Sequence, residues 1–174
     1  MNVRAAEPTL NTHKFHVYNQ RFALTAESGT NRAGSIATVT MEIAERERGG
    51  RGYLWSDKTA VQLTDLEMPE VIATLLGWRS VCQFSHHGPN RDKSIRVARD
   101  AERQRVVVQV SRPDVGRRTV ALIEAEQAAL AALVFSQYAR NRAPVEQGPL
   151  FAMLQAVFRG SPGRPPPPDI GRTS

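Results

Sequence analysis

The feature that most constrains the fold of this chain is a short strand that runs directly into a helix. In residues 58–63, the side chains of Thr59, Val61 and Leu63 alternate with those of Lys58, Ala60 and Gln62, and this period of two is typical of a half-buried strand. Apolar side chains then recur at helical spacing in residues 71–76. Because hardly any loop separates the two patterns, we expect the helix to lie back across a sheet.

The same unit occurs again about sixty residues later. Residues 118–123 have the β-branched composition of a strand, and residues 124–138 follow as an alanine- and leucine-rich helix with acidic residues at its start. Strand patterns also precede each unit, in residues 13–27 and 35–45 of the first half and in residues 80–111 of the second. The order of elements therefore predicts an α+β fold in which strands followed by a helix are duplicated.

The rest of the chain divides around this duplicated part. We expect residues 1–12 to form a flexible arm, because they show no periodicity, and residues 13–143 to form one domain. Residues 144–174 are predicted to contain a short amphipathic helix, within 150–159, followed by a disordered tail with four consecutive prolines.

Charge and cysteine content limit the environment and the partners of the protein. The chain carries a net charge of +6, and residues 79–118 account for all of it with ten basic and four acidic residues. Such a segment suits a phosphate backbone, although an arginine-rich solvated surface is the plainer alternative. Cys82 is the single cysteine, so no internal disulfide can form. With no signal peptide or membrane-length apolar run, we expect a cytoplasmic protein of a bacterium, associated with its nucleoid or with a mobile element.

The sequence offers no convincing catalytic or metal-binding motif. Cys82, His86 and His87 lie close together, but a tetrahedral metal site needs a further ligand and no second element supplies one. There is no nucleophile elbow, P-loop or dinucleotide-binding motif. The acidic pair Asp65 and Glu67 is better explained by its position at a helix start. We therefore expect a protein that is not an enzyme and uses neither metal nor cofactor.

Two short motifs bring a known family into view. Residues 53–58 read Tyr-Leu-Trp-Ser-Asp-Lys and residues 82–86 read Cys-Gln-Phe-Ser-His. In order and spacing they resemble the Tyr-Asp-Trp-Ser-Arg-Lys and Cys-Glu-Phe-Phe-His segments of the Whirly family of single-stranded DNA-binding proteins. Residues 18–25 fall where that family has Lys-Gly-Lys-Ala-Ala, with Arg21 as the remaining cation. The wider superfamily includes the transcriptional coactivator PC4 and the trypanosome mitochondrial RNA-binding proteins.

The resemblance implies a specific architecture and function. It implies two antiparallel sheets with the helices packed on one side, and protomers that associate through the helices into a homotetramer. It also implies sequence-independent binding of single-stranded DNA across the sheet surfaces, in replication, recombination or conjugative transfer. Aromatic side chains would hold bases while cations hold phosphates, as single-strand recognition requires.

The candidate binding residues combine this resemblance with the charge pattern. Aromatic candidates are base platforms or, alternatively, core residues, and cationic candidates are phosphate contacts or ordinary solvated strand residues. The full set is Tyr18, Gln20, Arg21, Phe22, Tyr53, Trp55, Lys58, Phe84, His86, Arg96, Arg99 and Arg105.

Two other functions fit the same sequence. An RNA-binding protein with annealing activity would use the same surface. An oligomeric transcription regulator or scaffold would instead contact protein through its sheets, and it would show little salt-dependent affinity for oligonucleotides.

Overall fold

The computed structural model describes residues 14–160, so the predicted N-terminal arm and the proline-rich tail lie outside the described residues. The first half of the described chain forms a four-stranded antiparallel sheet in the order β1-β2-β3-β4, followed by helix α1. A single turn of 3-10 helix, η1 (Trp55–Asp57), precedes the last of these strands. The elements are β1 (Lys14–Tyr18), β2 (Phe22–Thr30), β3 (Ala37–Glu45), β4 (Thr59–Gln62) and α1 (Met68–Leu75).

The second half repeats this arrangement. A second four-stranded antiparallel sheet has the order β5-β6-β7-β8 and is followed by α2 and then by α3. Its elements are β5 (Val81–His87), β6 (Lys93–Asp100), β7 (Arg105–Arg112), β8 (Gly116–Leu122), α2 (Glu124–Arg140) and α3 (Gln147–Gly160). The predicted duplication of strands followed by a helix is therefore confirmed, together with the α+β class.

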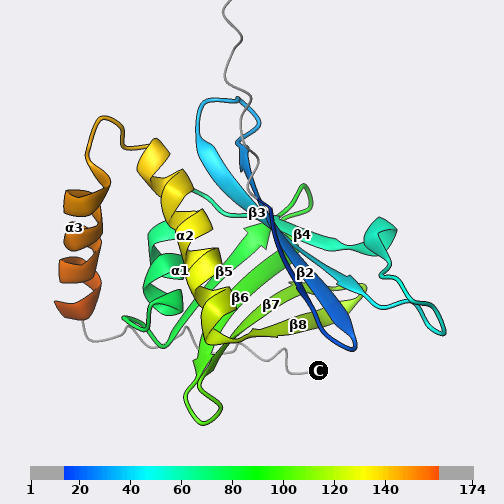
Figure 1. Cartoon of the computed structure of the whole chain (residues 1–174). Helices are drawn as coiled ribbons and strands as arrows, with labels where there is room; N and C mark the ends of the chain where they lie inside the picture. Colours follow the sequence, from blue (N-terminus) through cyan, green and yellow to red (C-terminus); the bar gives the residue numbers. More distant parts are fainter. Residues whose placement is uncertain (1–13, 161–174) are drawn as a thin grey trace, which may run out of the picture.

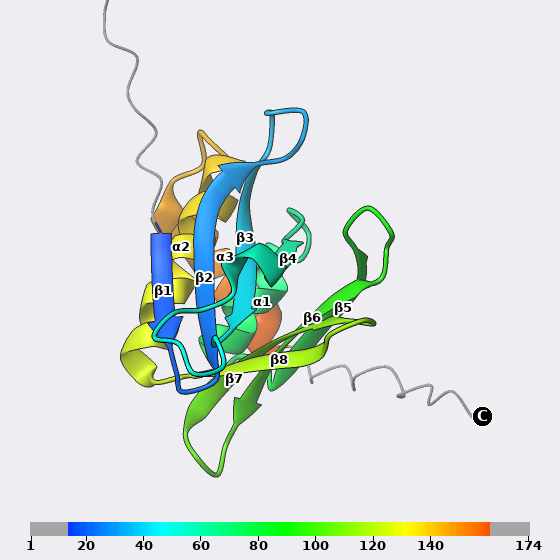
Figure 2. The same cartoon turned by 90° about the vertical axis from the view of Figure 1, so that its right-hand side faces the viewer.

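The two sheets run in different directions, and the helices gather on one side of them (Figure 1). Figure 2 shows the strands of the first sheet running steeply upward, while those of the second sheet cross beneath them. None of the helices in residues 14–160 is long and apolar enough to cross a membrane.

One hydrophobic core joins both sheets to the helices. Met41 and Ile43 in β3 and Val108 in β7 are completely buried, as the alternation in both strands requires. Leu130 of α2 closes the core from the helical side. Burying a side chain of this size contributes roughly 1.5–3 kcal/mol, so the shared core holds the two sheets in a fixed relation.

Helix α3 belongs to the same core. Its Leu150, Leu154 and Phe158 recur at helical spacing and are buried in the common hydrophobic cluster. Beside them, Phe151 packs edge-on against Trp78 and Phe135, with ring centroids 5.3 and 5.6 Å apart.

Candidate nucleic-acid interface

Four aromatic side chains form a continuous row on the outer face of the first sheet. The aromatic row consists of His16, Tyr18, Tyr53 and Trp55, and successive ring centroids lie 6.0, 5.6 and 6.5 Å apart. Tyr18 is 58% exposed. His16 is also exposed, whereas Tyr53 and Trp55 are half-buried. Aromatic rings with a face open to solvent can stack with bases.

Two separate segments supply the row. His16 and Tyr18 alternate in β1 with the buried Val17, so both point away from the core. Tyr53 and Trp55 come from the connection between β3 and β4, which folds over the sheet. The Tyr53 hydroxyl donates to the backbone carbonyl of Asn19 at 2.6 Å and so fastens this connection to the turn between β1 and β2.

Beside the row, the sheet surface is hollowed into a shallow trough of about 320 Å³. This volume is at the lower end of the roughly 300–1,000 Å³ range of small-molecule sites. The trough is lined by Lys14, His16, Tyr18, Thr25, Glu42, Trp55 and Lys58. Its lining mixes rings with both signs of charge.

The lysines of this face are already paired with carboxylates. Lys58 Nζ lies 2.8 Å from Glu42 Oε1, and Lys14 Nζ lies 3.4 Å from Glu27 Oε2. Exposed pairs of this kind contribute only about 0–1 kcal/mol, so a phosphate can compete for the lysine. The face therefore supplies stacking more than free positive charge.

The turn between β1 and β2 carries two further predicted residues. Gln20 and Arg21 are exposed there, and the side-chain oxygen of Asn19 accepts hydrogen bonds from the Arg21 and Phe22 amides at 2.9 and 2.7 Å. Arg21 Nε lies 3.5 Å from Glu45 Oε1. Phe22 is only 7% exposed and belongs to the core, so its interpretation as a base platform is replaced by a packing role.

In the second sheet, the aromatic candidates do not form a platform. Phe84 is partly buried and packs against the core. His86 is exposed, with φ of +66°, where the register between β5 and β6 breaks between Phe84 and His87. Of these two predicted binding residues, Phe84 therefore packs against the core and His86 lies at an irregularity of the sheet.

The arginines of the second sheet separate onto two faces. Arg99 turns toward the helices, where Nη1 donates to the carbonyl oxygens of Leu75 at 3.2 Å and Thr74 at 3.5 Å. A cation at the end of α1 also interacts favourably with the helix dipole. Arg99 therefore caps α1, although its side chain stays exposed, and its phosphate contact stays a prediction.

Arg96 and Arg105 lie on the opposite, outer face of the second sheet. The strand register aligns Arg96 with Gln83 and Gln109 across neighbouring strands. Arg96 makes no ion pair within residues 14–160, whereas Arg105 Nε lies 3.4 Å from Asp100 Oδ2. This face offers positive charge and hydrogen-bonding groups. The structure thus brings Tyr18, Tyr53, Trp55 and Lys58 together in the first sheet and leaves these two arginines in the second.

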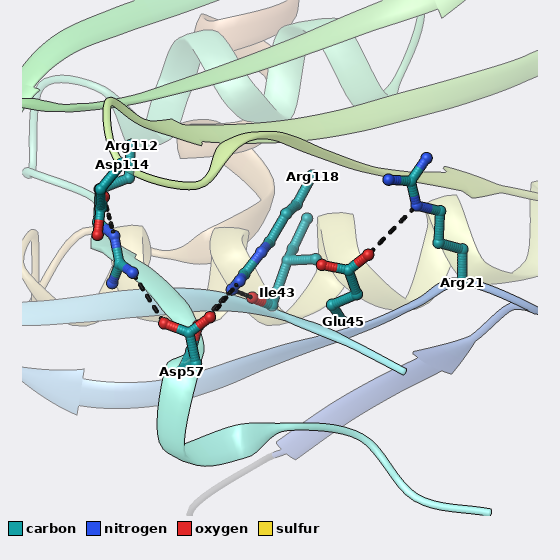
Figure 3. Close-up of polar contacts among 7 residues, drawn as sticks. All are labelled: Arg21, Ile43, Glu45, Asp57, Arg112, Asp114 and Arg118. Carbon is teal, nitrogen blue, oxygen red and sulfur yellow. Dashed lines mark hydrogen bonds and ion pairs between the residues drawn. The ribbon is translucent and has the colours of Figure 1, made fainter. Parts of the chain in front are cut away.

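The sequence analysis did not identify two arginines that hold η1, the turn that carries Trp55, in place. Arg118 of β8 is only 2% exposed, and its Nη2 donates to Asp57 Oδ2 at 2.8 Å (Figure 3). Its Nη1 donates to the backbone carbonyls of Ile43 and Asp57. Arg112 Nη2 donates to Asp57 Oδ1 at 2.8 Å. Hydrogen bonds from Arg112 and Arg118 hold the pKa of the Asp57 carboxyl below its usual value.

This cluster links the second sheet to the candidate site in the first. Asp57 ends η1, the turn that also carries Trp55. The sequence does contain a signal for this cluster. Arg118 alternates in phase with Val120 and Leu122, so a charged residue stands at a position of β8 where the alternation predicts an apolar one. A cation at such a position has to be paired.

The duplicated arrangement of a four-stranded antiparallel sheet followed by a helix defines a distinct class of α+β fold, and comparison with solved structures identifies it. The chain is similar to WHY3 from Arabidopsis thaliana, with a TM-score of 0.52 and 18% identity over 84% of this chain and 95% of that one. The plant transcriptional regulator PBF-2 gives a TM-score of 0.54 and 18% identity over 86% and 98%. The chain therefore has the fold of the Whirly proteins.

Two further solved structures share this fold. MRP1/MRP2 of Trypanosoma brucei gives a TM-score of 0.56 and 14% identity over 76% of this chain and 86% of that one. A guide-RNA-binding protein complex bound to a guide RNA gives a TM-score of 0.57 and 15% identity over 83% and 99%. No family model matches the sequence, and no curated protein does.

Proposed function

We propose that this protein binds single-stranded DNA with little sequence preference and that the aromatic row is its base-stacking surface. The observation that carries the proposal is the exposure of Tyr18 in a row of four rings on an open sheet face. Stacking on an aromatic ring stabilises each base by about 1–3 kcal/mol. Because every base has a π-face, such a row gives affinity without choosing a sequence.

Cations around the row are the proposed phosphate contacts. Arg21 is exposed beside Tyr18, and Lys58 lines the trough. Arg96 and Arg105 on the second sheet extend the positive surface. The role in the cell is then to coat or protect single strands in replication, recombination or transfer, without catalysis and without metal or cofactor.

Self-assembly through the helical side is part of the same proposal. The surface of α3 exposes Phe151 and Met153, and Leu76 at the end of α1 is also exposed. Apolar side chains on the side opposite the aromatic row suit an association that leaves the binding face open. A homotetramer is the assembly that we propose.

Titration of fluorescent oligonucleotides tests the function. Single-stranded homopolymers of thymine, adenine and cytosine are expected to bind with similar affinity, and a duplex of the same length much more weakly. The logarithm of the affinity should fall with the logarithm of the salt concentration by about 0.7 per phosphate neutralised. Light scattering on the same samples gives the oligomeric state. Equal affinity for duplex and single strand would contradict the proposal.

RNA binding is the second candidate, and it is favoured by the similarity to a guide-RNA-binding complex. Matched DNA and RNA oligonucleotides of one sequence separate the two, because the 2′-hydroxyl distinguishes them at a given site. A transcription regulator or scaffold that contacts protein through its sheets would show little salt-dependent affinity for either strand.

A further inference from the structure

The loop that follows β3 carries a concentration of unpaired arginines. We call residues 46–52 the arginine loop, which reads Arg-Glu-Arg-Gly-Gly-Arg-Gly and has a net charge of +2 from three arginines and one glutamate. Arg46, Arg48 and Arg51 are all exposed. Within residues 14–160, none of their side chains makes an ion pair or a hydrogen bond.

The glycines of this loop have a structural explanation, but its arginines do not. Gly49 has φ of +74°, a conformation that favours glycine. A Cβ atom on Gly50 would lie 2.7 Å from the Cβ atom of Glu47, so a side chain at this position would force the loop to shift. The Glu47 amide donates to the Gly52 carbonyl at 3.0 Å and closes the turn. The backbone is therefore fixed, while the three guanidinium groups remain available.

The other strand-to-strand turns of the described chain carry less charge. Residues 19–21 and residues 31–36 each contain one arginine, and residues 88–92 balance Arg91 with Asp92. Residues 101–104 contain one glutamate and one arginine, and residues 113–115 carry a single aspartate. A general enrichment in surface arginine would spread across these turns, so the concentration in the arginine loop calls for a local reason.

That reason lies in what the arginine loop adjoins. Arg46 forms a β-bridge with Tyr53, whose ring belongs to the aromatic row. The Arg46 amide also donates to the carbonyl oxygen of Arg21 at 2.7 Å. The arginine loop therefore leaves the sheet beside Tyr53 of the aromatic row and next to the turn between β1 and β2.

We propose that the arginine loop is a separate phosphate-binding arm, which holds the sugar–phosphate backbone of a single strand beyond the bases stacked on the aromatic row. Guanidinium groups form paired, charge-assisted hydrogen bonds with phosphate oxygens. The inference rests on the proposed function and adds a dependence on strand length. An oligonucleotide that covers only the four rings does not reach the arm, whereas a longer one does.

The test compares two double variants and two strand lengths. Arg48→Gln with Arg51→Gln removes two charges from the arginine loop, and Arg32→Gln with Arg91→Gln removes two exposed charges from other turns. Each is titrated with thymine oligonucleotides of roughly four and roughly fifteen nucleotides, spanning the usual range of single-strand site sizes. Circular dichroism and thermal melting confirm that the variants are folded.

We expect the arginine-loop variant to bind the long strand about tenfold more weakly and to lose about 0.7 of salt slope per arginine that contacted a phosphate. Its affinity for the short strand should stay within about twofold of the wild type, and the Arg32 and Arg91 variant should match the wild type with both strands. Unchanged affinity and slope in the arginine-loop variant, or an equal loss in the control variant, would overturn the inference while leaving the proposed function intact. A wild-type protein that binds no single strand defeats both.

Discussion

Arg118 and Asp57 are 61 residues apart in the chain, yet Arg118 Nη2 lies 2.8 Å from Asp57 Oδ2. Arg118 belongs to the last strand of the second sheet, and Asp57 ends the turn that carries Trp55 over the first sheet. This contact makes the position of one base-stacking candidate depend on a residue of the other sheet.

Substitution of Asp57 tests that dependence. In Asp57→Asn the carboxylate that accepts from Arg112 and Arg118 is lost, so we expect a melting temperature lowered by several degrees and a several-fold weaker affinity for single strands. Trp55 fluorescence should also shift. The matched control is Asp114→Asn, which removes a carboxylate that pairs with Arg112 but does not contact the turn. If both variants had equal effects, stability and affinity would depend on the net charge of the cluster and not on the hydrogen bonds that hold the turn.

A second prediction concerns the aromatic row itself. Tyr18→Ala removes its most exposed tyrosine and should weaken binding to every single-stranded sequence by about 1–3 kcal/mol, the contribution of one stacked base. Leu66→Ala is the control, because Leu66 is 80% exposed and lies outside the row. Oligonucleotide titration measures both. A loss confined to one base composition would contradict sequence-independent stacking.

The features of the fold and the site that could be predicted from the sequence are those that depend on residues close together in the chain. The alternation of Thr59 and Val61 and the helical spacing of Val71 and Leu75 predicted β4 and α1, because both patterns are local. The face that each side chain occupies was harder to predict. A shift of one residue in a strand exchanges its two faces, so the sequence left Phe22 open between a base platform and a core residue, and the structure shows it in the core.

Contacts between the two halves were beyond prediction. Arg99 looked like one more cation of a basic segment, yet it caps α1 through the carbonyl oxygen of Leu75. The pairing of Arg118 with Asp57 depends on how the two sheets cross, which no local pattern specifies. The aromatic row was predicted in part, through Tyr18, Tyr53 and Trp55. His16 was not predicted, because its stacking on Tyr18 follows only from knowing which face of β1 each side chain occupies.

Removal of the negative charge of Glu42, which pairs with Lys58, should strengthen the binding of single strands. Glu42 holds Lys58 at 2.8 Å on the candidate surface and repels phosphate. We therefore expect Glu42→Gln to bind single strands several-fold more tightly at low salt, with a steeper salt dependence. Lys58→Ala with Arg21→Ala should act in the opposite direction and weaken binding to all sequences alike. If Glu42→Gln leaves affinity unchanged, the strand does not pass over this trough.

Acid should destabilise the protein through carboxylates whose pKa is lowered by folding. Hydrogen bonds from Arg142 hold the pKa of Asp65 below its usual value, although partial burial opposes them. The folded state therefore binds fewer protons than the unfolded state, and the stability from this pair is complete above the ordinary carboxyl pKa of about 4. It is lost as the pH falls below that value and through the lower, folded-state pKa.

Thermal melting between neutral and acidic pH checks this sign. Asp65→Asn should be less stable than the wild type at neutral pH, and the difference should shrink as the pH falls below about 4. Glu102→Gln is the control, since Glu102 is exposed and makes no ion pair within residues 14–160. A difference between Asp65→Asn and the wild type that stays constant with pH would mean that Asp65 acts through its shape and not through its charge.

Helix α3 allows stability and assembly to be tested separately on one element. Leu154 is buried in the common core, so Leu154→Ala should lower the free energy of unfolding by about 2–5 kcal/mol in denaturant titration. Met153, its neighbour, is 49% exposed, so a substitution there should change the stability of the protomer by no more than about 0.5 kcal/mol. If the helices form the subunit interface, Met153→Glu should instead reduce the oligomer size in light scattering, because it places a charge on the exposed apolar side of the helix. An unchanged oligomer in Met153→Glu would exclude this side of α3 from the interface, whereas loss of stability in Met153→Glu alone would place the side chain in the protomer core.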